Sequence, residues 1–186
     1  MIRRATVEDA EAIARTHVAA WAETYRQLPP EVLARRTVPD RTATWTRILS
    51  QDPPDPHRAE VAVLDLDGAL QGFASWGEQR DASLRDRGFG GEISAIYLLA
   101  QAQGQGHGRA MMARAARGLL SRGHHGASLW VAQDNHHARA VYERLGGVPC
   151  GEGSDDIAGH PIVSVAYGWA DLAALATSGA GPVPAP

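Results

Sequence analysis

The spacing of apolar residues along the chain predicts several amphipathic helices. Apolar side chains recur every three or four positions over residues 8–25 and again over residues 107–122, where they form two neighbouring rows. A proline break precedes a helical piece that starts at Pro30, and a further helix is expected to end near Leu49. The segment "DNHHARAVYERLGG" has a capping residue at its start and glycines at its end, which favours one more helix.

Runs rich in β-forming residues predict the strands. Two of them flank Asp67-Gly68, a dipeptide that suits a tight hairpin turn. The other expected strands are 2–5, 92–99, 127–133, 148–151 and 162–169. The order is helices, a β-hairpin, and then strand-helix-strand-helix-strand-strand. This order predicts an α+β fold in which one right-handed crossover joins the strand at 92–99 to the strand at 127–133.

Composition narrows the class of protein. The 186 residues suffice for one domain with a substantial core, and the net charge of -3 gives no general attraction to nucleic acid or to an anionic membrane. No apolar run approaches the length of a membrane span, and the N-terminus has no secretory pattern. With a single cysteine, Cys150, we expect a cytoplasmic protein. All 18 basic residues are arginine, which excludes catalysis by lysine.

A glycine-rich segment, Q-G-Q-G-H-G at residues 103–108, stands between the strand at 92–99 and the helix at 107–122. It lacks the G-x-G-x-x-G spacing of a dinucleotide site and the lysine of a nucleoside-triphosphate loop. A glycine turn at a helix N-terminus still offers unpaired N–H groups to an anion. From spacing alone, a phosphate-binding loop and a plain tight turn are equally good interpretations.

The motifs resemble those of one known family. Q-x-x-G-x-G from Gln103 to Gly108 is similar to the acetyl-coenzyme A motif of the GNAT N-acetyltransferase superfamily. Asn135, Ala138, Tyr142 and the following "ERLGG" resemble its N-x-x-A-x-x-x-Y-E-x-x-G pattern, and "IRRATVEDAEAIARTHVAAW" resembles a GNAT start. The resemblance covers residues 1–171 as one domain and leaves 172–186 as an expected disordered tail.

This chain departs from the usual family pattern at three positions. Arginine is commoner than Gln103 at the start of the loop, although glutamine occurs. Ala100 stands where proline is usual, and His107 stands where an aliphatic residue is usual. At a helix N-terminus an imidazolium would oppose the helix dipole, so we expect His107 to be neutral.

The resemblance implies a fold, an activity and a set of binding residues. The fold is a mixed, mostly antiparallel sheet, splayed between strands 4 and 5 and flanked by helices. The activity is direct transfer of the acetyl group of acetyl-coenzyme A to a primary amine of a small molecule or peptide, without a metal. The backbone N–H of Leu98 would stabilise the oxyanion. The residues implied in coenzyme binding are Ile96, Tyr97, Leu98, Gln103, Gly104, Gln105, Gly106, His107, Gly108, Arg109, Asn135 and Tyr142.

Three side chains are given a role by the resemblance, and each has a plainer alternative. Tyr142 is the expected general acid for the thiolate leaving group, or else an aromatic core contact. Glu92 is the expected general base, or else a solvated charge at a strand end. Asn135 caps its helix, binds coenzyme A, or does both.

Other interpretations compete with this one. The histidine pairs at 124–125 and 136–137 suggest a metal, but no cysteine or acid completes either set. Cys150 is expected to be buried, and Trp45 and Trp76 to pack in the core unless they line an acceptor pocket. A coenzyme A-binding regulatory module without turnover is the main functional rival, followed by a nucleotide-dependent oxidoreductase. A homodimer is compatible with the sequence.

Overall fold

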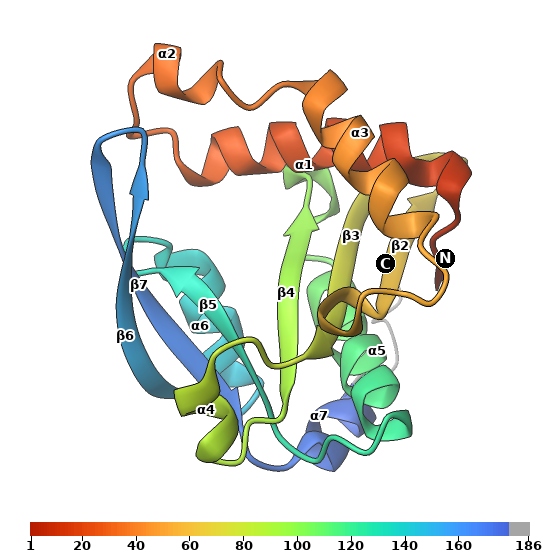
Figure 1. The fold of residues 1–186 in the computed structure, drawn as a ribbon, viewed down its shortest axis with the longest axis vertical. Coiled ribbons are helices and arrows are strands. Elements are labelled where there is room, and N and C mark those ends of the chain that lie inside the picture. Colours follow the sequence, from red (N-terminus) through yellow and green to blue (C-terminus); the bar gives the residue numbers. More distant parts are fainter. Residues whose placement is uncertain (179–186) are drawn as a thin grey trace.

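A seven-stranded sheet forms the centre of the molecule, in the order β1-β2-β3-β4-β5-β7-β6 (Figure 1). The computed structural model describes residues 1–178. The strands are β1 (Ile2–Arg4), β2 (Glu60–Leu66), β3 (Ala69–Glu78), β4 (Gly91–Leu98), β5 (Ala127–Ala132), β6 (Val148–Ile157) and β7 (His160–Trp169). All neighbouring strands are antiparallel except β4 and β5. The predicted α+β class is confirmed.

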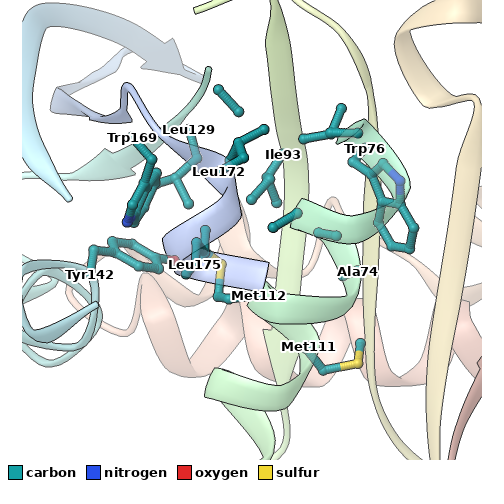
Figure 2. Packing of buried hydrophobic residues seen from close by; sticks show 14 of the residues in the cluster. Ala74, Trp76, Ile93, Met111, Met112, Leu129, Tyr142, Trp169, Leu172 and Leu175 are labelled. Atoms are coloured by element: carbon teal, nitrogen blue, oxygen red, sulfur yellow. The ribbon is translucent and has the colours of Figure 1, made fainter. Parts of the chain in front are cut away.

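Helices cover both faces of this sheet. They are α1 (Ala10–Thr24), α2 (Pro30–Leu33), α3 (Val38–Leu49), α4 (Ala82–Asp86), α5 (His107–Ser121), α6 (His136–Arg144) and α7 (Leu172–Thr177). Helices α1 and α3 pack on one face, against Val63 and Phe73 of the first hairpin. Helix α5 packs on the other face with α6 and α7, and its two predicted apolar rows lie in this core (Figure 2). No helix within residues 1–178 is long and apolar enough to cross a membrane.

The turn between β2 and β3 follows the sequence prediction. Asp67 and Gly68 both have positive φ angles, 54° and 79°. Two successive left-handed residues are what a two-residue hairpin turn of this type requires, and aspartate followed by glycine tolerates them best.

β4 and β5 pair over a very short length and then diverge (Figure 1). Only Gly91 with Ala127 and Glu92 with Ser128 are matched between them. Directly after this pair, β4 carries an extra residue at Ser94, because Trp76 of β3 pairs with Ile93 and Ser75 pairs with Ala95. A β-bulge bends its strand, so the bulge explains why β4 leaves β5 at this point. The splay between strands 4 and 5, predicted by resemblance, is confirmed.

The C-terminal boundary predicted from the sequence is wrong for residues 172–177. These residues form α7, in which the side chains of Leu172 and Leu175 are 0% and 1% exposed. The carbonyl of Ala176 also accepts a hydrogen bond of 2.8 Å from Arg117 of α5. Burial against α5 therefore orders a segment that the sequence placed in a disordered tail. Residues 179–186, the rest of that predicted tail, lie outside the described residues.

Two further elements differ from the sequence predictions. Helix α4 lies in a polar stretch for which the sequence predicts no element, and there Leu84 packs with Phe89 and Cys150. The last two strands are longer than expected, and they form a hairpin of ten residues on each side. Glycines and acidic residues, which have low β propensity, make up half of β6, so a propensity argument does not predict the full length of this strand.

Candidate active site

The glycine loop after β4 has the conformation of an anion cradle. Gly104 and Gly106 have φ angles of 75° and 82°, which favour glycine, and a Cβ atom at either would meet nothing within 4 Å. The first hydrogen bond of α5 runs from the N–H of Ala110 to the carbonyl of Gly106. Among the described residues, no acceptor binds the backbone N–H groups of residues 104–109. These donors and the open space beside the glycines fit a phosphate group.

The two glutamines of the loop hold its backbone in place. Gln103 donates from Nε2 to the carbonyl of Leu98 at 3.0 Å, and Gln105 donates to the carbonyl of Gln101 at 2.7 Å. Gly108 lies where a Cβ would come within 3.3 Å of the Leu98 side chain, so its lack of a side chain allows α5 to approach β4 closely. Two more of the predicted binding residues lie in the first turn of α5. His107 is half-buried and Arg109 is exposed.

Beyond the bulge, β4 presents an unpaired edge toward the splay. Leu98 pairs with Gly72 of β3. The next residue, Leu99, donates its N–H to the carbonyl of Gln71 and so directs this group toward β3. Because successive residues of a strand direct their backbone groups to opposite sides, the N–H of Leu98 points toward the splay. The side chain of Tyr97 lies on the α1 face, with its ring centroid 5.0 Å from that of His17.

Tyr142 faces the same region from α6. Its ring is 7% exposed and packs edge-on against Trp169 at 6.0 Å between centroids (Figure 2). Within residues 1–178, the Tyr142 hydroxyl has no hydrogen-bond partner. Burial, together with the phenol of Tyr97, raises the pKa of Tyr142 above its ordinary value. The hydroxyl is therefore a protonated group and a potential proton donor.

Asn135 marks the start of the helix that carries Tyr142. Its Oδ1 accepts a hydrogen bond from the N–H of Ala138 at 3.1 Å, so the capping role is confirmed. The cap fixes the first turn of α6 and, through it, the direction in which Tyr142 points.

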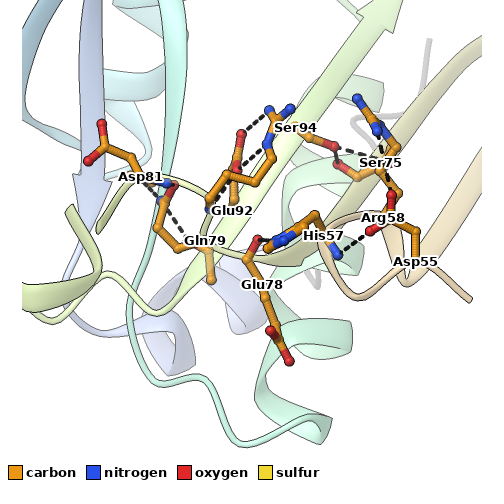
Figure 3. A network of polar contacts seen from close by, with 12 residues as sticks. Asp55, His57, Arg58, Ser75, Glu78, Gln79, Asp81, Glu92 and Ser94 are labelled. Atoms are coloured by element: carbon orange, nitrogen blue, oxygen red, sulfur yellow. Dashed lines mark hydrogen bonds and ion pairs between the residues drawn. The ribbon is translucent and has the colours of Figure 1, made fainter. Parts of the chain in front are cut away.

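Glu92 is the last residue of β4 that pairs with β5, so it lies at the vertex of the splay, the point where the two strands begin to diverge. Its side chain is 4% exposed, which contradicts the interpretation as a solvated strand-end charge. Arg80 binds both carboxylate oxygens, and this ion pair raises the pKa of Arg80. Nearby, Gln79 donates to Ser128 Oγ at 2.6 Å and to the carbonyl of Gly91, so polar side chains fasten β4 to β5 below the splay (Figure 3).

A comparison with family models decides the class of protein. Residues 17–147 match the model of the acetyltransferase (GNAT) family. The chain belongs to the GNAT family.

Relatives and solved structures agree with this assignment over most of the chain. The chain is 33% identical, over 95% of its length and 96% of the relative's, to YuaI of Bacillus subtilis (strain 168), an uncharacterized N-acetyltransferase. Its fold is similar to that of PaiA N-acetyltransferase from Thermoplasma acidophilum in complex with coenzyme A, with a TM-score of 0.62, 18% identity, and coverage of 89% and 96% of the two chains. It is also similar to YncA of Salmonella typhimurium with acetyl-CoA, with a TM-score of 0.64, 18% identity, and coverage of 92% and 93%.

On the face of the sheet opposite α5, the sequence analysis missed two residues near the splay. Trp130 of β5 is 37% exposed, and a Cβ at Gly153 would come within 3.2 Å of its indole, so glycine makes room for this ring. His17 of α1 accepts a hydrogen bond from Trp45 Nε1 at 3.2 Å, and burial lowers the pKa of His17 to about 3. The helical spacing places His17 on the apolar face of α1 and gives no sign of this contact.

The remaining candidates have structural roles in this GNAT protein. Trp45 and Trp76 are 3% and 0% exposed, so both pack in the core. Cys150 is buried, and burial raises its pKa, which does not favour a nucleophilic thiolate. Across residues 1–178, no three His, Cys, Asp or Glu side chains come close enough together to hold a metal ion.

Proposed function

We propose that this GNAT protein transfers the acetyl group of acetyl-coenzyme A directly to a primary amine of a small molecule or peptide. The observation that carries the proposal is the convergence of three features on one splay. These are the free N–H groups of residues 104–109, the unpaired edge of β4 and the protonated hydroxyl of Tyr142. Acetyl-coenzyme A supplies the acetyl group as a reactive thioester.

Different backbone groups of the chain bind different parts of acetyl-coenzyme A. The N–H groups of residues 104–109 hold the pyrophosphate, with the help of the dipole of α5. Backbone groups of residues 96–98 hold the pantetheine arm as a neighbouring strand would, and the N–H of Leu98 donates to the carbonyl oxygen of the thioester. His107, Arg109 and Asn135 border this path and complete the proposed coenzyme site.

Two side chains handle protons. Tyr142 keeps its proton at the hydroxyl and gives it to the departing sulfur, because a thiol of ordinary pKa leaves more readily when it is protonated. Glu92 accepts the proton of the amine, after Arg80 releases one carboxylate oxygen or through an intervening water.

The decisive experiment has two parts. Acetyl-coenzyme A is first titrated against the full chain in a thermal-shift assay, and a panel of amines is then screened for thiol release, with mass spectrometry of the product. We expect a thermal shift and release of thiol with an acetylated amine. Absence of a shift contradicts coenzyme binding. A shift without thiol release for any amine supports the regulatory-module alternative instead.

A further inference from the structure

Arg36 carries a half-buried guanidinium that has no acidic partner among the described residues. It lies between α2 and α3, with its Cζ 4.2 Å from the centroid of the Trp21 ring. No carboxylate of residues 1–178 comes within 4.0 Å of it. Burial lowers the pKa of Arg36, the direction expected for a cation that lacks compensation.

Among the described residues, the one side chain within hydrogen-bond distance of Arg36 does not satisfy its donors. Arg36 Nη1 lies 3.2 Å from His17 Nε2, while Trp45 Nε1 lies 3.2 Å from His17 Nδ1. Arginine and tryptophan are donors only, and a neutral imidazole has a single acceptor nitrogen. One of the two donors is therefore left without an acceptor.

Burial decides which donor this is. Trp45 is 3% exposed and packs against Phe73, so an outside acceptor does not reach its N–H, and His17 Nδ1 must serve it. His17 Nε2 then carries the proton, so it is a donor that faces the donors of the Arg36 guanidinium, and His17 offers Arg36 no acceptor. Arg36 instead borders a pocket, where a bound group can supply the missing acceptor.

The pocket beside Arg36 suits a small anion attached to an apolar body. It has a volume of about 180 Å³, and its lining includes three arginines, Arg35, Arg36 and Arg41, against one acid, Asp40. The carboxylate of Asp40 accepts a hydrogen bond from the hydroxyl of Thr37 at 2.7 Å. Apolar surface comes from Trp21, Val32 and Ile157.

Side chains in contact link the residues of this pocket to β4, on the face of the sheet opposite α5. Arg36 contacts His17, and the ring of His17 is 5.0 Å from that of Tyr97 on β4. Ile157, at the end of β6, closes the pocket from the other side of the splay and packs with Trp21 in one apolar cluster. An anion held by Arg36 would thus lie on the acceptor side of the proposed reaction.

We propose that the acceptor is an amine that also carries a carboxylate, of the amino-acid class, and that Arg36 binds this carboxylate. The inference rests on the proposed acetyl transfer and specifies its substrate. A guanidinium presents two parallel N–H groups that match the two oxygens of a carboxylate, and stacking on Trp21 fixes its plane. The amine is then directed past His17 and Tyr97 toward β4.

The test compares acceptors that differ only in the anion. Leucine, leucinamide and isoamylamine share an apolar body, and similar trios from other amino acids cover different side chains. We expect the wild type to acetylate at least one acid with kcat/KM about 10-fold or more above its amide, as the loss of a charged hydrogen bond predicts. Equal rates for acid, amide and decarboxylated amine across the trios would overturn the proposal.

Variants separate binding of the anion from support of the fold. Arg36→Gln should raise the KM for the preferred acid about 10-fold or more and abolish the preference for the acid over the amide. Arg36→Lys should retain part of the preference, because the charge remains. Arg47→Gln, at an exposed arginine of α3, is the matched control and should leave both unchanged. A preference that survives in a folded Arg36→Gln protein contradicts the proposal.

A binding measurement keeps this inference distinct from the proposed reaction. Calorimetric titration of the full chain with each trio, in the presence of coenzyme A, needs no turnover. We expect the acid to bind about 10-fold or more tightly than the amide. Absence of thiol release with every acceptor would contradict the acetyl transfer, whereas acid and amide binding alike would contradict only the role of Arg36.

Discussion

Arg80 and Glu92 form a two-pronged ion pair at the vertex of the splay. Arg80 Nη2 lies 2.5 Å from Glu92 Oε1, Nε lies 2.9 Å from Oε2, and the backbone N–H of Arg80 donates to Oε2 as well. The side chain of Arg80 is 46% exposed, whereas that of Glu92 is 4% exposed. The arginine is therefore the partner that can move into solvent and release the carboxylate.

Replacement of Glu92 tests whether this carboxylate accepts the proton of the amine. Glu92→Gln should lower turnover at neutral pH about 10²-fold, because the amide is not a base, while coenzyme A still binds. The defect should shrink at high pH, where the amine loses its proton unaided. The measurement is a pH–rate profile of both proteins.

Arg80→Gln is the matched variant for that experiment. It removes the ion pair but leaves the carboxylate, so it should lower the free energy of unfolding while turnover persists. If both variants lose turnover equally, the ion pair serves only to fasten the strands and Glu92 is not the base.

Tyr142→Phe tests the proposed proton donor. The variant keeps the packed ring and loses only the hydroxyl, so kcat should fall about 10²-fold with the melting temperature and coenzyme A affinity nearly unchanged. Single-turnover kinetics make the chemical step visible. The control is Tyr167→Phe, whose hydroxyl binds Glu143 and Arg139. That variant should lose stability and keep kcat. Equal chemical rates for Tyr142→Phe and the wild type would rule out the proton-donor role.

Gly106→Val tests the phosphate cradle. Wild-type protein should gain about 2.7 kcal/mol of stability at a coenzyme concentration 100 times its Kd. The valine side chain projects into the open space beside the free N–H groups, so most of this gain should disappear.

Gly123→Val controls for backbone strain in that experiment. Gly123 lies just beyond the other end of α5 and has a φ of 85°, and a Cβ atom there would also meet nothing within 4 Å. The variant should lose a similar amount of intrinsic stability and keep the full response to coenzyme. A full response in Gly106→Val as well would show that the loop does not bind phosphate.

Burial of His17 predicts a loss of stability in mild acid. Its pKa falls from 6.5 to about 3 on folding, so below pH 6.5 the unfolded chain takes up a proton that the folded chain does not. The free energy of unfolding should therefore drop by about 2 kcal/mol between pH 7 and pH 5 from this group alone. Denaturant unfolding at both pH values checks this. His17→Gln should remove that part of the pH dependence, and identical slopes for the two proteins would contradict it.

Local spacing predicted the glycine turn before α5 and the cap of α6, because these signals lie within short segments, whereas the family resemblance gave these residues their proposed role in coenzyme binding. The left-handed glycines of 104–106, the cap at Asn135 and the position of Tyr142 two turns later each follow from a few neighbouring residues. The family resemblance added the splay, whose physical origin, the bulge at Ser94, leaves no mark in the sequence.

The contacts around Arg36 and Glu92 could not be predicted in this way. His17, Arg36 and Trp45 come from separate elements, and their shared shortage of acceptors exists only once the helices are packed. Arg80 meets Glu92 only because β3 pairs with β4, and it lies in a polar stretch for which the sequence predicts no element. The sequence does not predict α7, because this helix is short and alanine-rich and shows little periodicity. Its packing against α5 becomes visible only in the structure.

The splay gives the fourth strand of the sheet an unusual position. A central strand normally has the amide protons most protected from exchange with solvent, since both of its neighbours accept them. Past Glu92, β4 has such a neighbour only in β3, so alternate amides of this central strand behave as those of an edge strand. Hydrogen exchange along β4 should therefore alternate between slow and fast residues, and a ligand that pairs with the strand should slow the fast set.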